Sequence, residues 1–396
     1  MPHAESWQAG IDRRLREAAE TRKIPGVVAV AANAAGVIYQ GAFGRSRLPD
    51  GSPMRADAMM WIASMTKAIT AVAAMQLVEQ GKLSLDQPAA ELAPELDAAM
   101  VLEGFDTAGK PMLRTARGRI TLRKLLTHTA GFSYENWNPL LRRYFAVTGL
   151  PAGGGKLASL TAPLIADPGT RWEYSIGLDW VGRLMEIAGG DRFDRYLQKN
   201  ILGPLGMTDT TYQLREDQEA RLATVHQRAP DGTLTAFERE RVRDPEFFSG
   251  GGGLYSTAHD YIRFLRMLLQ GGRLGDAVLL QPETVALMGQ NHTGALEVGT
   301  LLSANPAMTN DLQIFPGVGK GWGLSFLVNT ETAPTGRSAG SLAWAGMGNC
   351  YYWLDPKRGL CGVMMTQILP FADPVVLQLF EEFETAVYSA EQCVSA

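Results

Sequence analysis

Apolar positions near the N-terminus change from a helical to an extended spacing. Over residues 6–22 apolar side chains recur every three or four positions, which predicts an amphipathic helix. A continuous apolar run occupies residues 26–32, turn residues follow at 33–36, and residues 37–40 resume the extended pattern. This arrangement predicts a β-hairpin directly after the first helix.

The last ninety or so residues show a similar pattern. Three apolar runs predict strands, the last two joined by a turn at 355–359, namely 323–328, 350–354 and 360–365. Asp373 and Pro374 then begin a closing helix with a single apolar stripe. Because hairpins and helices occur at both chain ends, we expect one antiparallel sheet built from both ends and flanked by helices.

The middle of the chain has a different character. Short helical patterns separated by Gly and Pro turns fill the region from about residue 81 to residue 249. We therefore expect two units: an α/β domain made from residues 1–80 and 250–396, and a mainly helical domain of residues 81–249. A small substrate would bind in the cleft between them.

A serine and a lysine stand one helical turn apart before this middle region. A helical pattern runs from Met65 to Gln80, so Ser64 would lie at the helix N-terminus, with Lys67 on the same face. Unpaired N–H groups at a helix start stabilise developing negative charge, and an amine stripped of water can accept a proton. Ser64 is thus a candidate nucleophile with Lys67 as its partner.

A serine–lysine site needs a second proton carrier to protonate the leaving group and activate the next nucleophile. Tyr174 lies between a turn and a predicted helix, where its phenol could point into the cleft. Residues 344–349 precede a predicted strand, and their small side chains let the backbone approach a substrate closely. An N–H of that strand could share an oxyanion with the Ser64 N–H.

Taken in order, these three segments resemble the serine β-lactamase and penicillin-binding-protein superfamily, and within it the family VIII carboxylesterases related to class C β-lactamases. Segments 125–131, 204–210 and 251–257 are also similar to that family, and the resemblance runs from Ile24 to Met365. It implies an α/β fold of the α+β type: a β-lactamase-like antiparallel sheet flanked by helices, plus a mainly helical lobe.

The resemblance also implies roles for individual residues. Ser64 would be the nucleophile, Lys67 its partner and Tyr174 the proton shuttle, although either Lys67 or Tyr174 could act as the primary base. The catalytic set would need no metal and no cofactor.

On the substrate side, the resemblance puts the second oxyanion donor at the Met347 backbone N–H. Gly346 and Trp344 precede it, and Trp344 stands where β-lactamases carry a lysine. Ile176 replaces the asparagine that β-lactamases of this type carry two positions after the tyrosine. Both departures favour a neutral ester over an anionic β-lactam.

The predicted reaction is therefore hydrolysis of short-chain carboxylic esters through an acyl-enzyme on Ser64. A β-lactamase or D-Ala-D-Ala peptidase, an acyltransferase to an alcohol, and a non-catalytic binding module remain alternatives. The sequence leaves the natural ester and the oligomeric state open.

The composition of the chain argues against several classes of binding partner. The 396 residues are 46% hydrophobic and 20% charged, with a formal charge of −4, which gives no basic surface for nucleic acid and no sign of a membrane partner. Five scattered histidines and three cysteines lack the spacing of metal ligands or a disulfide framework. Met1 to Glu5 lack the basic start of a leader, so we expect a cytoplasmic protein with a small-molecule ester as its partner.

Overall fold

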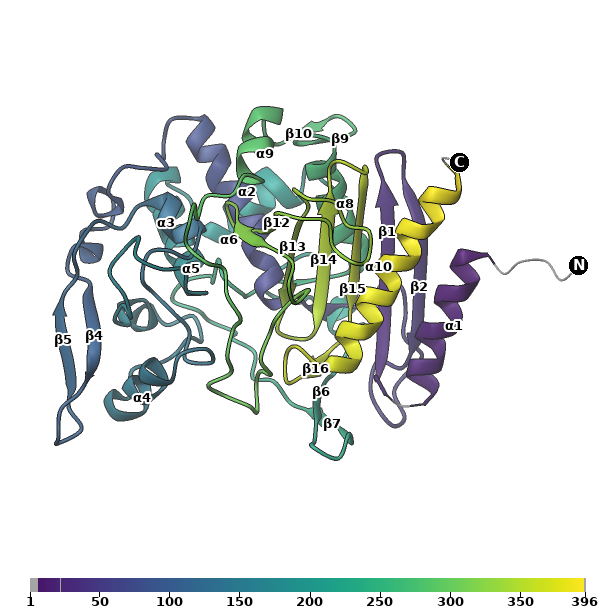
Figure 1. Ribbon diagram of the computed structural model, residues 1–396, viewed down its shortest axis with the longest axis horizontal. Coiled ribbons are helices and arrows are strands. Elements are labelled where there is room, and N and C mark those ends of the chain that lie inside the picture. The colour runs from purple at the N-terminus through teal and green to yellow at the C-terminus, as the bar shows by residue number, and fades with distance from the viewer. Residues whose placement is uncertain (1–5, 22, 395–396) are drawn as a thin grey trace, which may run out of the picture.

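The computed structural model describes residues 6–21 and 23–394, and its centre is a seven-stranded antiparallel sheet (Figure 1). Both chain ends contribute strands to it. In spatial order the strands are β11 (Lys320–Trp322), β12 (Leu327–Asn329), β13 (Leu342–Gly346), β14 (Cys350–Asp355), β15 (Leu360–Met365), β1 (Gly26–Asn33) and β2 (Val37–Gly44). The expectation of one antiparallel sheet built from both chain ends is confirmed. The residues 1–5 that carried the leader argument lie outside the described part.

The two ends meet where β1 pairs with β15, from Val28 opposite Met365 to Asn33 opposite Leu360. These strands are buried on both faces, which explains why they read as continuous apolar runs in the sequence. Helices α1 (Trp7–Glu20) and α10 (Pro374–Val394) pack together in front of the sheet in Figure 1, and α8 (Ala258–Leu269) packs against β1 and β15 behind it.

One predicted strand is wrong. Residues 323–328 do not form a single strand, because the chain reverses between β11 and β12. The Gly323 N–H donates to the Phe326 carbonyl at 2.8 Å, and Ser325 takes a left-handed conformation with φ of 77°. The apolar side chains of this turn are buried, so their pattern resembled that of a strand.

The middle region holds helices and two small hairpins. Its helices include α3 (Leu122–Leu126), α4 (Pro139–Thr148), α5 (Gly177–Gly189), α6 (Phe193–Leu197) and α7 (Glu216–Glu219), and its strands are β4 (Met100–Phe105), β5 (Pro111–Thr115), β6 (Val225–Arg228) and β7 (Leu234–Phe237). Strand β6 also pairs in parallel with β16 (Ile368–Leu369), so this region is tied to the C-terminal segment. The division into domains at residues 81 and 250 stays a prediction.

A short two-stranded sheet and a tight turn position Ser64 at the start of a helix. β3 (Met60–Trp61) pairs with β8 (Tyr255–Ser256), and the 3-10 turn η1 (Ala63–Met65) leads into helix α2 (Thr66–Glu79). Helix α2 is buried on nearly every side, as its apolar composition requires. Three further elements follow α8 along the chain, namely β9 (Arg273–Leu274), β10 (Ala277–Val278) and α9 (Pro282–Met288).

Within the described residues, none of the helices has both the length and the hydropathy needed to cross a bilayer.

Candidate active site

Ser64 lies in the turn η1 and borders a cavity. The preceding residue, Ala63, has φ of 44°, a left-handed conformation that residues with a Cβ adopt at a cost of about 1–3 kcal/mol. The Met65 N–H donates to the Ile62 carbonyl at 3.0 Å and closes this turn. The strained turn presents the Ser64 hydroxyl to the cavity instead of placing it inside the helix.

Lys67 follows one turn later and is only 1% exposed. Its Nζ donates to three oxygens: the Gly251 carbonyl at 2.6 Å, Ser64 Oγ at 3.1 Å and the Tyr134 hydroxyl at 3.1 Å. An ammonium carries three N–H donors, so these acceptors can engage all of them. The amine therefore has a fixed direction, with one donor on the candidate nucleophile.

Two tyrosine rings enclose the amine. Lys67 Nζ is 5.1 Å from the ring centre of Tyr134 and 4.8 Å from that of Tyr174. The Tyr174 oxygen accepts a hydrogen bond from Trp344 Nε1 at 3.0 Å, and within the described chain it makes no hydrogen bond to Ser64 or Lys67. Burial raises the pKa of Tyr134 well above its usual value, so that phenol stays protonated.

A buried carboxylate supports the lysine from behind. Asp179, near the start of α5, accepts from the Ser249 hydroxyl at 2.6 Å and from the Gly251 N–H at 2.8 Å. Burial raises the pKa of Asp179, while Ser249, Lys67 and the Gly251 N–H act in the opposite direction. Asp179 thus holds the loop whose Gly251 carbonyl binds Lys67, and it provides negative charge to the same surroundings.

The edge of β13 approaches the serine turn closely. A Cβ on Gly346 would lie 2.2 Å from the Ile62 carbonyl oxygen, so only glycine permits this contact. Met347 follows and lines the cavity together with Ser64. The strand therefore brings the backbone at Met347 to the side of Ser64, and its role as a second oxyanion donor stays a prediction.

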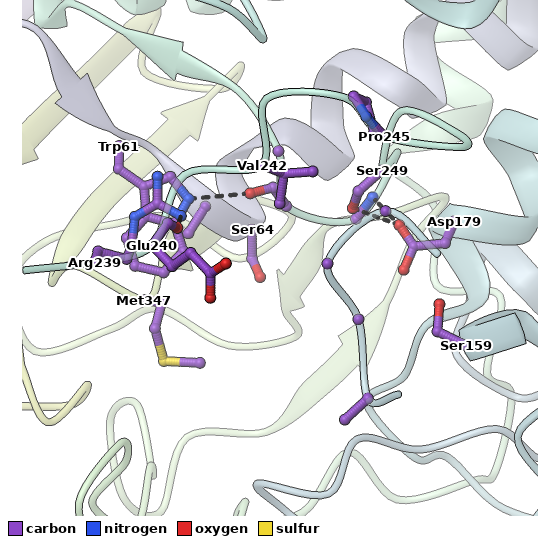
Figure 2. A pocket seen from close by; sticks show the side chains of 18 of the residues that line it. Trp61, Ser64, Ser159, Asp179, Arg239, Glu240, Val242, Pro245, Ser249 and Met347 are labelled. Carbon is purple, nitrogen blue, oxygen red and sulfur yellow. Dashed lines mark hydrogen bonds between the residues drawn. The ribbon is translucent and has the colours of Figure 1, made fainter. Parts of the chain in front are cut away.

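The cavity beside Ser64 has a volume of about 760 Å³. Figure 2 shows Trp61, Arg239, Glu240 and Met347 on one side of Ser64, and Asp179 and Ser249 on the other. Aromatic side chains form much of the wall, including Tyr134, Trp137, Tyr174, Tyr212, Phe247 and Phe248. A drug-sized molecule fits such a volume.

The structure brings the sequence-predicted residues together, although not all of them touch the cavity. Ser64, Tyr174 and Met347 line it, and Lys67 lies directly behind Ser64. Trp344 contacts Tyr174 and borders a second cavity of about 460 Å³ instead. Gly346 acts through its close approach to Ile62.

Sequence reasoning missed Tyr134, Asp179 and the Gly251 carbonyl. Tyr134 gives no signal in the sequence beyond an aromatic side chain near a turn. The glycine run 250–253 and an acidic residue five positions after Tyr174 were the available signals for the other two.

In the described part of the chain, no three His, Cys, Asp or Glu side chains cluster as metal ligands would. Cys350 and Cys361 are buried free thiols, and the Cys393 side chain is outside the described set.

Comparison with known proteins agrees with this geometry. A family model described as Beta-lactamase matches residues 11–385. The chain is 38% identical to monacolin J acid methylbutanoyltransferase of Aspergillus terreus, with 96% of each chain covered. It is 34% identical to lovastatin esterase of Penicillium rubens, over 96% of this chain and 98% of the relative.

The β-lactamase-like fold expected from the sequence is confirmed, and a solved structure shares it. Unliganded simvastatin synthase (LovD) from Aspergillus terreus superposes with a TM-score of 0.85 at 36% identity, covering 98% of this chain and 99% of that one. Membership of family VIII in particular stays a prediction. The match along the chain, the shared fold and the Ser64–Lys67 site together show that this protein belongs to the Beta-lactamase family, as an enzyme of its serine acyl-transfer and hydrolysis group.

Proposed function

We propose that this protein is a serine acyltransferase: it moves a short acyl group from an ester or thioester donor through Ser64 to an alcohol. Hydrolysis of esters, the reaction predicted from the sequence, would be the outcome when water replaces the alcohol. The observation that carries the proposal is the 3.1 Å contact between Ser64 Oγ and Lys67 Nζ at the wall of a cavity of about 760 Å³.

The first half of the reaction follows from the groups around Ser64. As Ser64 Oγ attacks the acyl carbonyl, its proton passes to Tyr174, which enters this step as a phenolate and becomes a neutral phenol. The backbone N–H groups of Ser64 and Met347 bind the oxyanion. The Trp344 N–H donates to the Tyr174 oxygen and the Lys67 ammonium lies against the ring, so both stabilise negative charge there. Collapse of the intermediate breaks the bond to the leaving group, which takes the proton, and leaves an acyl-Ser64 ester.

The second half reverses these steps with a new nucleophile. An alcohol gives its proton to Tyr174, attacks the acyl-Ser64 carbonyl, and Ser64 leaves with the proton returned. The relatives named as acyltransferases support an alcohol in this step, and the cavity has room for an acceptor far larger than water. Its aromatic walls also favour an organic acceptor over a water molecule.

Partition of the acyl-enzyme tests the proposal. p-Nitrophenyl butyrate is supplied as donor with a series of primary and secondary alcohols, and p-nitrophenol release and butyryl ester formation are measured together. We expect ester formation to exceed hydrolysis at millimolar concentrations of a preferred alcohol. Ser64→Ala should abolish both products, because both pass through the same acyl-serine.

Two results would contradict the proposal. Hydrolysis without transfer to any alcohol would identify an esterase, and an active Ser64→Ala variant would remove the nucleophile from its role. Turnover of the β-lactam nitrocefin distinguishes the β-lactamase alternative from acyl transfer. Its turnover should be weak, because Ile176 and Trp344 supply neither an amide nor a cation for a β-lactam.

A further inference from the structure

An arginine lies inside the Ser64 cavity with no role in the chemistry described above. Arg239, in the segment after β7, lines the cavity beside Trp61 (Figure 2). Trp61 and Tyr255 are directly opposite each other in the β3–β8 ladder, so their side chains share one face. The guanidinium lies 4.3 Å from the Trp61 ring centre and 5.3 Å from that of Tyr255.

The two rings are themselves held in place. The Trp61 N–H donates to Gln367 Oε1 at 3.1 Å, and its indole Nε1 donates to the Gly252 carbonyl at 3.2 Å. The Tyr255 hydroxyl accepts a hydrogen bond from Arg239 Nη2. The guanidinium is therefore kept in one plane by cation–π contact and a hydrogen bond, unlike a free surface side chain.

This cation lacks an anionic partner. Its other hydrogen bond runs from Nη1 to the Glu240 backbone carbonyl at 3.3 Å, and among the described residues no carboxylate forms an ion pair with it. Arg239 is partly buried, and this burial lowers the pKa of its guanidinium, while Tyr255 acts in the opposite direction. Arg241, two positions on, shows the ordinary arrangement, with an ion pair to Glu219 at 2.6 Å.

We propose that Arg239, supported by Trp61 and Tyr255, is a carboxylate-binding subsite, and that one of the two molecules joined at Ser64 carries a carboxylate. The proposal rests on the proposed function, and it adds the class of substrate. A guanidinium offers a planar fork of N–H donors that fits a carboxylate with two hydrogen bonds. An anion bound there would form an ion pair with the guanidinium and so offset the hydration that the cation loses on burial.

The position of the subsite fits a charge remote from the reacting bond. In Figure 2 Arg239 and Met347 lie on the same side of Ser64, away from Asp179. A carboxylate on that side would avoid the buried negative charge of Asp179 behind Lys67. The carboxylate could belong to the acyl group or to the alcohol, since both must extend from Ser64 into this cavity.

Matched pairs of reagents that differ only in charge test the two positions. For the acyl side, the p-nitrophenyl monoester of glutarate is compared with that of glutaramate. For the alcohol side, butyryl transfer to 5-hydroxypentanoate is compared with transfer to 5-hydroxypentanamide. In one pair we expect kcat/KM to favour the carboxylate by about tenfold or more, the range of a charge-assisted hydrogen bond.

Variants assign that preference to Arg239. Arg239→Gln should reduce the carboxylate-to-amide ratio to about one, and Arg239→Lys should keep part of it, because a point charge remains without the planar fork. Arg241→Gln is the matched control, and its ratio should equal that of the wild type. A ratio near one in both wild-type pairs, or a preference that survives in Arg239→Gln, would overturn the proposal. A ratio lost equally in Arg241→Gln would indicate long-range attraction in place of a subsite, and would overturn it as well.

The test is kept separate from the proposed function by two measurements. Labelling of Ser64 by a neutral serine-directed phosphonate reports the acyl-transfer machinery without any carboxylate. Calorimetric titration with 5-hydroxypentanoate and glutarate reports anion binding without turnover, and at least one of them should bind the wild type more tightly than Arg239→Gln. Failed labelling with Arg239-dependent binding would reject the function alone, whereas normal labelling without such binding would reject the subsite alone.

Discussion

At the scale of single residues, the site depends on how each polar group near Lys67 is engaged. The Lys67 amine directs its donors at three oxygens, and the Tyr134 oxygen is one of them. The Tyr174 oxygen instead receives a proton donor, the Trp344 indole. The two phenols lie within reach of the same amine, yet their hydrogen bonding prepares them for different roles.

This difference leads to a prediction for the two tyrosines. Tyr174→Phe should lower kcat for p-nitrophenyl butyrate by about a hundredfold or more, the usual contribution of a general acid–base group. Tyr134→Phe removes one acceptor of Lys67 but no proton carrier, so we expect only about a tenfold loss. The steady-state rate of p-nitrophenol release at saturating ester measures kcat for both variants.

Lys67→Ala, alone and combined with Tyr174→Phe in a double variant, provides the control. Losses from Tyr174→Phe and Lys67→Ala should combine non-additively, because the two groups act on one proton. If Tyr134→Phe proved the more damaging change, the proton-carrying role would pass to Tyr134.

Asp179 gives a prediction about pH. Its raised pKa means that the folded protein binds a proton where an unfolded aspartate is charged, so stability falls as pH rises through this titration. Activity runs the opposite way, because Lys67 loses its buried counter-charge when Asp179 is protonated at low pH. We expect an acid limb in kcat/KM above the ordinary range for aspartate, and a loss of about tenfold or more in Asp179→Asn.

The acid limb should be absent from the residual activity of Asp179→Asn. Glu135 is the matched control, since burial also raises its pKa and it borders the same cavity. Disappearance of the limb in Glu135→Gln, with its survival in Asp179→Asn, would assign the titration to Glu135 and contradict this prediction.

At the scale of elements, the site depends on the contact between η1 and β13. The turn carries Ser64, the strand carries the Met347 backbone, and Gly346 lets them meet against the Ile62 carbonyl. The position of the Met347 backbone beside Ser64 therefore depends on backbone packing between two elements that are far apart in the sequence.

Gly346→Ala tests this contact. The new Cβ would meet backbone at 2.2 Å, so one element must shift, at a cost of about 1–3 kcal/mol in the free energy of unfolding. A displacement near Ser64 should lower kcat by about a hundredfold. Denaturant unfolding and steady-state kinetics measure the two effects.

Gly10→Ala is a matched control inside α1, where nothing lies within 4 Å of the added Cβ. It should stabilise the protein by about 0.5–1 kcal/mol, because alanine is the better helix former. An unchanged kcat and an unchanged free energy of unfolding in Gly346→Ala would show that the contact is not required.

How far the sequence could predict these features depends on the range of the interactions. The Ser64–Lys67 pair could be found because the two residues are one helical turn apart, and the hairpin strands because their apolar runs are continuous. The reversal at Ser325 could not be found, since its left-handed conformation leaves no mark on the apolar pattern. The contact from Tyr134 to Lys67 spans 67 positions and forms only after the chain folds.

At the scale of the whole molecule, closure of the sheet by both chain ends fixes the site. Strand β15 joins β1, and β13, two strands further along the same sheet, packs against η1. The loop at Gly251 then reaches Lys67 from 184 positions away. The fold class was predictable because strands and helices leave local apolar patterns. The full set of site residues was not, because the contacts that assemble it are long-range.

The outer helices α1 and α10 have a practical consequence. Among the residues that the structure describes, none that lines the Ser64 cavity belongs to α1, α10, β1 or β2. Attachment of the protein to a bead, an electrode or a fused carrier through α1 or α10 would therefore leave the described cavity-lining residues untouched.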